Sequence, residues 1–175
     1  MQLTETTVQK NYVYRGKIIS VRSDDALLPD GSPCKRELIE HSGGAAVLYV
    51  EDGKLLLVKQ FRYAYGEVIY EIPAGKLEKG EDPKQAALRE LEEEAGVCAT
   101  EAELLFVLYP TPGYTNEKIY IYKAENGVKK TAHPDDGEFI AAEWIALSEA
   151  ERMLKNGVLR DAKTIVALQA YLLNK

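Results

Sequence analysis

Residues 75–97 read GKLEKGEDPKQAALRELEEEAGV, in which a glycine-bearing loop leads into a strongly acidic segment. Asp82 suits the N-cap of a helix, Pro83 suits its first position, and Gly96 supplies a C-terminal stop. The pattern therefore predicts a short helix over residues 83–95, with its carboxylates gathered in the C-terminal half.

The apolar residues of this predicted helix recur at spacings of three and four and form one stripe that should face a core: Ala87, Leu88, Leu91 and Ala95. At roughly 100° per residue, Glu90 and Glu94 project together from one margin of the stripe, whereas Glu93 points nearly away from it. Like charges at i and i+4 repel each other, and a cation between them turns that repulsion into binding. Mg²⁺ is a hard ion that takes carboxylate, carbonyl and phosphate oxygens, so it is the natural occupant. A solvated acidic face is the alternative interpretation.

The surroundings of the acidic pair add parts of a site. Arg89 lies one turn before Glu93 and can hold it as an i,i+4 ion pair, which gives Glu93 a partly structural role. In the preceding loop, Gly75 lets the backbone approach a bound group closely. Glu81 could brace that loop, position a metal-bound water or complement the helix dipole. The loop and the helix together indicate a site for phosphate and metal.

Composition narrows the class of protein. The length of 175 residues suits one domain, and the net charge of −6 argues against a nucleic-acid surface. An anionic ligand would then be attracted by metal ions and a few local basic side chains. The first residues lack the apolar region of a signal peptide, and no apolar run approaches the ~20 residues of a membrane helix. We expect a cytoplasmic protein with no membrane partner.

Most of the remaining pattern predicts short strands, separated by turn signals such as Asp30-Gly31 and Asp52-Gly53. Strands are predicted at residues 17–22, 36–41, 45–50, 54–61, 68–72, 104–109, 118–123 and 139–145. Two further helices are predicted at residues 148–156 and 161–173. Strands on both sides of one central helix, followed by helices, indicate the α+β class rather than alternating βαβ units.

The acidic segment matches a known pattern at every fixed position. Gly75, Glu81, Arg89-Glu90-Leu91, Glu93-Glu94 and Gly96-Val97 fit the Nudix box, G-x5-E-x7-R-E-U-x-E-E-x-G-U, so the chain resembles the Nudix hydrolases. The resemblance implies an α/β/α sandwich with a mixed sheet, preceded by N-terminal antiparallel strands. It implies one Nudix hydrolase domain over residues 1–175, in which residues 1–40 are N-terminal strands suited to forming a dimer and residues 41–175 are the catalytic core.

The resemblance also implies a chemistry, the hydrolysis of a nucleoside diphosphate linked to another group with Mg²⁺ or Mn²⁺. In this family the residues at the positions of Glu90 and Glu94 ligate metal, the backbone carbonyl at Ala74 often joins them, and Glu93 sometimes does. The metal would neutralise the diphosphate and lower the pKa of the attacking water.

Signals outside the box resemble the ADP-ribose pyrophosphatase branch. Pro112-Gly113 lies in YPTPGYTNE, 15 residues beyond Val97, and the segments 60–62 and 71–75 are similar to the Q-x-R…E-L-P-A-G pattern of that branch. The arginine at the position of Arg36 helps bind the diphosphate or the ribose there. The candidate substrate contacts are therefore Arg36, Arg62, Pro112, Gly113 and Glu117. A surface strand residue is the alternative reading of each arginine.

The general base in that branch is a glutamate on a loop after the box. The matching stretch is residues 133–139, where we choose Glu138 for its longer reach and Asp136 second, with Glu93 as a further catalytic candidate. A surface acidic loop is the alternative.

The leading hypothesis is the conversion of ADP-ribose and water to AMP and ribose 5-phosphate. The alternatives are another Nudix substrate, such as a nucleotide sugar, NADH, a dinucleoside polyphosphate or a nucleoside triphosphate, and a sensor that binds a nucleotide without cleaving it. The branch resemblance also implies a homodimer, with N-terminal strands crossing to the partner and Arg36 serving the neighbouring site.

Overall fold

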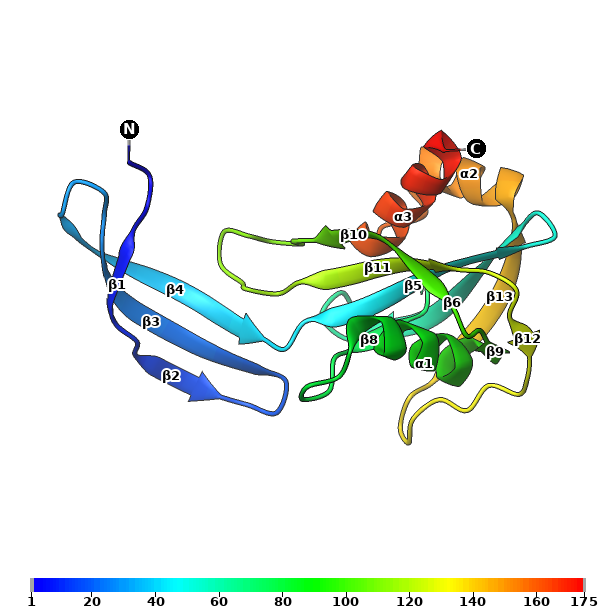
Figure 1. Ribbon diagram of the computed structural model, residues 1–175, viewed down its shortest axis with the longest axis horizontal. Coiled ribbons are helices and arrows are strands. Elements are labelled where there is room, and N and C mark those ends of the chain that lie inside the picture. The colour runs from blue at the N-terminus through cyan, green and yellow to red at the C-terminus, as the bar shows by residue number, and fades with distance from the viewer. Residues whose placement is uncertain (1, 175) are drawn as a thin grey trace. The chain divides into compact units, whose positions relative to one another are not determined.

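The structure is a computed structural model that describes residues 2–174 (Figure 1). The chain divides into two compact units. The N-terminal unit contains the residues up to Gly43 together with Tyr109–Lys118. The core unit contains Gly44–Leu108 and the chain from Ile119 onward. Within residues 2–174, no helix is long and apolar enough to cross a membrane.

The N-terminal unit is an antiparallel sheet built around its longest strands. Its strands are β1 (Thr6–Gln9), β2 (Tyr12–Arg15), β3 (Ile19–Leu27) and β4 (Pro33–His41), and β3 pairs with each of the other three. The predicted Asp30-Gly31 turn joins β3 to β4, and Gly31 adopts a φ of 84° there, which a glycine reaches without strain. The antiparallel N-terminal strands that the family resemblance implies are therefore present.

The segment Tyr109–Lys118 belongs to this unit because it is bonded to the end of β4. The amide of Ile39 donates to the carbonyl of Tyr114 over 2.7 Å, and the amide of Asn116 donates to the carbonyl of Ile39 over 3.2 Å. The side chain of Asn116 also accepts the amide of His41 over 2.9 Å.

The core unit is built on a mixed sheet. Its strands run in the order β10 (Ala102–Leu108), β11 (Ile119–Ala124), β5 (Gly44–Glu51), β6 (Lys54–Arg62) and β13 (Ile140–Ala146). The β11–β5 pair is parallel and the other neighbours are antiparallel. Two short strands extend it, β7 (Glu67–Glu71) beside β6 and β8 (Ala74–Lys76) beside β5, and a separate small sheet pairs β9 (Val97–Cys98) with β12 (Val128–Lys129).

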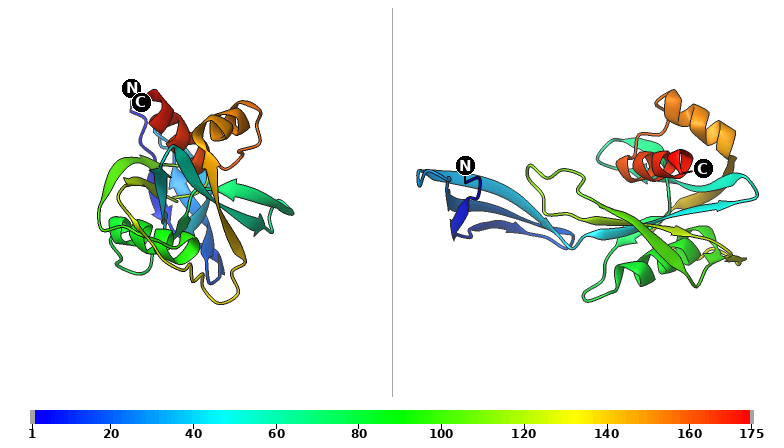
Figure 2. Two further views of the ribbon diagram at one scale, coloured as in Figure 1. Left: turned by 90° about the vertical axis from the view of Figure 1, so that its right-hand side faces the viewer. Right: turned by 45° about the horizontal axis from the view of Figure 1, so that its top comes forward.

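Helices cover both faces of this sheet (Figures 1 and 2). Helix α1 (Pro83–Ala95) packs with Val47 and Tyr49 of β5, whereas α2 (Leu147–Lys155) and α3 (Ala162–Leu173) pack with Ala46 and Leu48 of the same strand. Successive side chains of a strand point to opposite faces, so β5 lies between two apolar layers and contributes side chains to both. The α/β/α sandwich with a mixed sheet is confirmed.

Helix α1 begins and ends where its sequence predicts. The Asp82 side chain accepts the amides of Lys84 and Gln85, and Gly96 adopts a left-handed φ of 63° at the C-terminal end. The other predicted elements lie within a few residues of the observed ones, except that β3 runs well past Arg22 to Leu27. The strands β1, β2, β8, β9 and β12 were not predicted by residue number, because each is four residues or shorter.

Candidate active site

Two glutamates of α1 are buried although neither belongs to the apolar stripe. Glu90 is 8% exposed and Glu94 is 5% exposed. Burial raises the pKa of Glu94 to about 8, and the amide of Ala74, which donates to Glu94 Oε2 over 3.0 Å, only partly opposes it. Burial also raises the pKa of Glu90, against the opposing charge of Arg89. Burial therefore disfavours the ionised form of both carboxyls, and a bound cation would stabilise that form.

Arg89 binds three carboxylates, one member of the buried pair and two that lie beside it. It donates to Glu81 over 2.9 Å, to Glu90 over 2.8 Å and to Glu93 over 2.7 Å. Glu81 also accepts the amide of Glu78 over 2.9 Å, so it braces the loop before α1. The predicted Arg89–Glu93 pair is present, and Arg89 in addition ties the loop to the helix.

Gly75 allows the backbone of β8 to approach Glu90. A Cβ atom at this position would lie 1.8 Å from Glu90 Oε1, a distance that no side chain tolerates. Pairing with β5 fixes the segment, because Ala74 and Gly75 lie opposite Ala46 and Ala45. This close approach places the backbone of Ala74-Gly75 against both buried carboxylates.

The donor set fits a hard divalent cation. Among residues 2–174, no group of three or more His, Cys, Asp and Glu side chains forms a ready metal cluster. The pair Glu90 and Glu94 would need another oxygen, and the backbone carbonyl of Ala74 is of the type that Mg²⁺ takes. Oxygen donors, burial and raised pKa values all suit such an ion, so these residues would hold it.

Glu138 lies within electrostatic reach of the pair. Its negative charge is among the causes that raise the pKa of both Glu90 and Glu94. Glu138 is exposed and follows a turn in which its amide donates to the carbonyl of Asp135 over 2.9 Å. The fold thus brings Glu138 within electrostatic reach of the buried carboxylates.

Arg62 lies at the end of β6 and pairs with Glu71 of β7. Its Nε donates to Glu71 Oε1 over 2.5 Å and its Nη2 donates to Oε2 over 2.7 Å. The negative charge of Glu94 helps to raise the pKa of Arg62, so this guanidinium also lies within electrostatic reach of the site. The sequence assigned no role to Glu71 beyond its place in the segment 71–75, although a charged residue inside a predicted strand is a usable signal.

The other candidate substrate contacts belong to the N-terminal unit. Arg36 is exposed on β4 and forms a bidentate pair with Glu5, with distances of 2.8 and 2.6 Å. Pro112 and Gly113 are exposed in the segment bonded to β4, and Glu117 lies 3.4 Å from His41 Nδ1. These residues belong to the N-terminal unit, whereas the carboxylates of α1 belong to the core unit.

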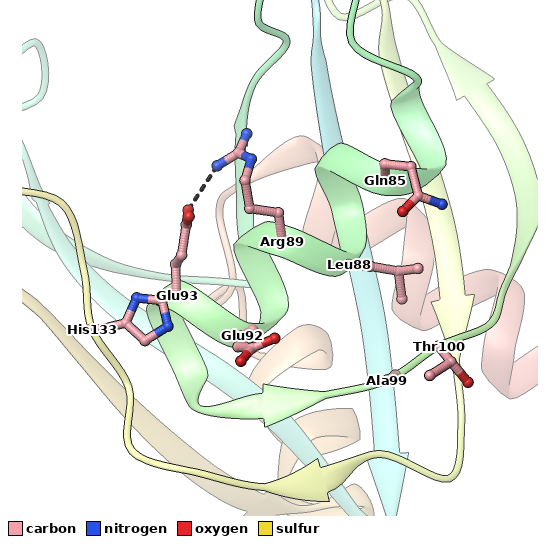
Figure 3. A pocket seen from close by; sticks show the side chains of 8 residues that line it. All are labelled: Gln85, Leu88, Arg89, Glu92, Glu93, Ala99, Thr100 and His133. Carbon is pink, nitrogen blue, oxygen red and sulfur yellow. Dashed lines mark hydrogen bonds and ion pairs between the residues drawn. The ribbon is translucent and has the colours of Figure 1, made fainter.

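A groove of about 570 Å³ lies along a different side of α1 (Figure 3). Its lining residues come from α1, from the chain after β9 and from the loop before β13: Gln85, Leu88, Arg89, Glu92, Glu93, Ala99, Thr100 and His133. Figure 3 shows the Arg89 and Glu93 side chains pointing toward each other at its rim. Neither Glu90 nor Glu94 lines it, whereas Glu93, the further candidate ligand, does.

Comparisons with known proteins agree with this arrangement. Residues 40–168 match the NUDIX domain, and residues 5–39 match the nucleoside diphosphate sugar hydrolase N-terminal domain. The ADP-ribose pyrophosphatase of Bacillus subtilis is 40% identical over 170 residues, which cover 95% of this chain and 92% of that protein. The methanol dehydrogenase activator of Bacillus methanolicus is 39% identical over 168 residues, which cover 94% and 91%.

A solved structure supports the fold. The crystal structure of an ADP compounds hydrolase superposes with a TM-score of 0.86 at 22% identity, covering 99% of this chain and 95% of that chain. At that identity the likeness concerns the fold alone. The family match, by contrast, spans most of the chain and contains the buried carboxylates of α1. The chain belongs to the Nudix family of hydrolases.

Proposed function

We propose that the protein is an ADP-ribose pyrophosphatase, which converts ADP-ribose and water to AMP and ribose 5-phosphate. The observation that carries the proposal is the buried pair Glu90 and Glu94 against the backbone of Ala74-Gly75, with the charge of Glu138 close enough to perturb both. The Bacillus subtilis relative bears the name of this activity and aligns with nearly the whole chain.

Each group of the site has a role in this proposal. Glu90 and Glu94, with the carbonyl of Ala74 and with Glu93 as an occasional further ligand, would hold Mg²⁺, or Mn²⁺ in its place. A bound divalent cation would supply charge neutralisation of the diphosphate and a lower pKa for the attacking water. Glu138 would accept the proton of that water. Arg62 would donate to a diphosphate oxygen, as guanidinium groups do.

The N-terminal unit would supply further substrate contacts. We place Arg36, Pro112, Gly113 and Glu117 in this role and propose a homodimer formed through the N-terminal strands, working in the cytoplasm. A monomeric mass in solution would contradict the dimer without affecting the proposed chemistry.

Hydrolysis of a nucleoside diphosphate sugar is the second candidate. One observation favours it, the match of residues 5–39 to the N-terminal domain of nucleoside diphosphate sugar hydrolases. A substrate panel distinguishes these functions.

The test is a comparison of substrates at equal concentration with Mg²⁺ and with Mn²⁺. The panel contains ADP-ribose, a nucleotide sugar, NADH, a dinucleoside polyphosphate and a nucleoside triphosphate, and products are separated by chromatography. We expect ADP-ribose to be turned over fastest, with AMP as a product. Negligible AMP release beside fast turnover of another compound would overturn the proposal, and no turnover of any compound would favour a nucleotide sensor.

A further inference from the structure

Behind Arg62, a chain of alternating charges runs from β6 to the start of α3. Glu71 accepts the bidentate bond of Arg62 and also the ammonium group of Lys163, and Lys163 in turn donates to Asp161 over 2.9 Å. Lys163 and Glu71 are 92 residues apart in sequence. The order of charges is thus positive, negative, positive, negative, with Arg62 at one end.

The middle of this chain is buried and its end is open. Glu71 is 2% exposed and Lys163 is 8% exposed, whereas the side chain of Arg62 is 39% exposed. Burial alone would favour the neutral form of Glu71, but the hydrogen bonds and charges of Arg62 and Lys163 outweigh it and lower its pKa. Glu71 is therefore an ionised carboxylate that needs both cations.

The same end of α3 fixes the backbone that leads into the candidate metal site. The amide of Ile72 donates to Thr164 Oγ1 over 2.8 Å, and that hydroxyl donates to Asp161 Oδ2 over 2.6 Å. Ile72 lies two residues before Ala74, whose amide donates to Glu94. The first residues of α3 thus hold both the strand that carries Glu71 and the approach to the carboxylate pair.

The geometry of the Arg62 pair leaves one edge of the guanidinium available. Glu71 takes the edge formed by Nε and Nη2, and Nη1 takes no part in the pair. A guanidinium bound along one edge has its plane fixed, so the direction of its remaining N–H groups is fixed as well. Glu71 therefore determines where Nη1 points, provided that Glu71 is itself held.

We propose that Lys163 is a positioning residue for the substrate, acting through Glu71 to fix the Arg62 guanidinium so that its Nη1 edge meets a diphosphate oxygen. This inference rests on the proposed function, in which Arg62 contacts the diphosphate.

A double-mutant cycle tests the proposal. Lys163→Met keeps the apolar stem and removes the ammonium, and Arg62→Ala removes the group on which Lys163 is proposed to act. We expect Lys163→Met to raise KM for ADP-ribose about tenfold with kcat changed less than about threefold, and to change KM less than about twofold in the Arg62→Ala background. Equal effects in the two backgrounds, or no effect in the native one, would overturn the positioning role.

Two controls separate positioning from a loss of fold. Lys59→Met removes another lysine–glutamate pair of β6, Lys59–Glu143 with a distance of 2.5 Å, which has no bond to Glu71. We expect its KM to equal that of the native protein. If the Lys163→Met chain does not fold, Lys163→Gln, which retains a hydrogen-bond donor, takes its place in the cycle.

A substrate-free measurement distinguishes failure of this inference from failure of the proposed function. Absence of ADP-ribose turnover in the native protein would contradict the proposed function. The hydrogen exchange of the Arg62 Nε–H, followed by ¹⁵N NMR in the absence of substrate, reports the bond to Glu71 directly. We expect faster exchange in Lys163→Met than in Lys59→Met, and equal exchange would overturn the role of Lys163.

Discussion

Glu92 and Glu94 lie two residues apart on α1, and the fold places their carboxylates in opposite environments. Glu94 is buried beside Ala74, and burial raises its pKa to about 8. Glu92 lies on the flank that borders the groove, where a hydrogen bond from Lys130 over 2.8 Å lowers its pKa. The fold therefore disfavours the ionised form of Glu94 and favours the ionised form of Glu92. A strongly shifted pKa of this kind is typical of residues in functional sites.

The largest expected effect is on the buried flank. Glu94→Gln removes one of the two carboxylates proposed to hold the cation, so we expect kcat/KM for ADP-ribose to fall by about a thousandfold or more. The fold should remain, because an amide is neutral and Glu94 sits where a charge is disfavoured. Steady-state kinetics at saturating Mg²⁺, with circular dichroism as the check on folding, measure this. Turnover at the native rate would contradict the metal-binding role.

The next effect separates the two acidic residues of the loop before β13. The charge of Glu138 is among the causes that raise the pKa of both Glu90 and Glu94. We expect Glu138→Gln to lower kcat by about 10²–10⁴-fold with a much smaller change in KM, while Asp136→Asn stays close to the native rate. A severe Asp136→Asn variant beside a nearly normal Glu138→Gln variant would show that the base is Asp136.

Several features of α1 and its acidic residues could be predicted from the sequence. The ends of α1 were predictable because Asp82 and Gly96 act on the neighbouring backbone, and the helical angle alone set Glu90 and Glu94 apart from Glu93. The pairing of Arg89 with Glu93 follows from the same local geometry. The burial of the two carboxylates does not follow from local geometry, because it depends on the backbone of Ala74-Gly75, which lies against them.

Contacts between distant segments were beyond reach of the sequence pattern. Lys163 reads as an ordinary exposed lysine near the start of a helix, yet it is buried against Glu71, 92 residues away. The choice between Glu138 and Asp136 is of the same kind, since it depends on how a loop approaches α1. The segment Tyr109–Lys118 reads as part of the catalytic core, and only its bonds to Ile39 and His41 group it with β4.

A smaller effect concerns stability and its dependence on pH in the absence of metal. Folded Glu94 keeps its proton up to about pH 8, whereas in the unfolded chain a glutamate releases it near its ordinary value of 4.5. Between these values the folded state binds more protons, so its contribution to stability is full below pH 4.5 and is lost as the pH rises toward 8. The loss from one such group is at most ~1.4 kcal/mol per pH unit.

Urea unfolding in the presence of a chelator at pH 5, 6, 7 and 8 measures this loss. We expect the free energy of unfolding of the native protein to fall relative to that of Glu94→Gln as the pH rises, since the variant lacks the titrating group. Adding Mg²⁺ near pH 7 should restore stability and release protons, because the cation binds the ionised carboxylate. A difference between the two proteins that is constant with pH would contradict the raised pKa.

The smallest expected effect is on the other flank of α1. Glu92→Gln removes the pair with Lys130, whose side chain is 49% exposed, and exposed ion pairs contribute little to stability. We expect kcat, KM and the unfolding temperature of this variant to match those of the native protein within error. The substitution has the same chemistry as Glu94→Gln, two residues away on the same helix, so the two variants differ only in environment. If Glu92→Gln lost activity as Glu94→Gln does, burial would not be what separates the two flanks, and the groove beside Glu92 would have to be part of the catalytic site.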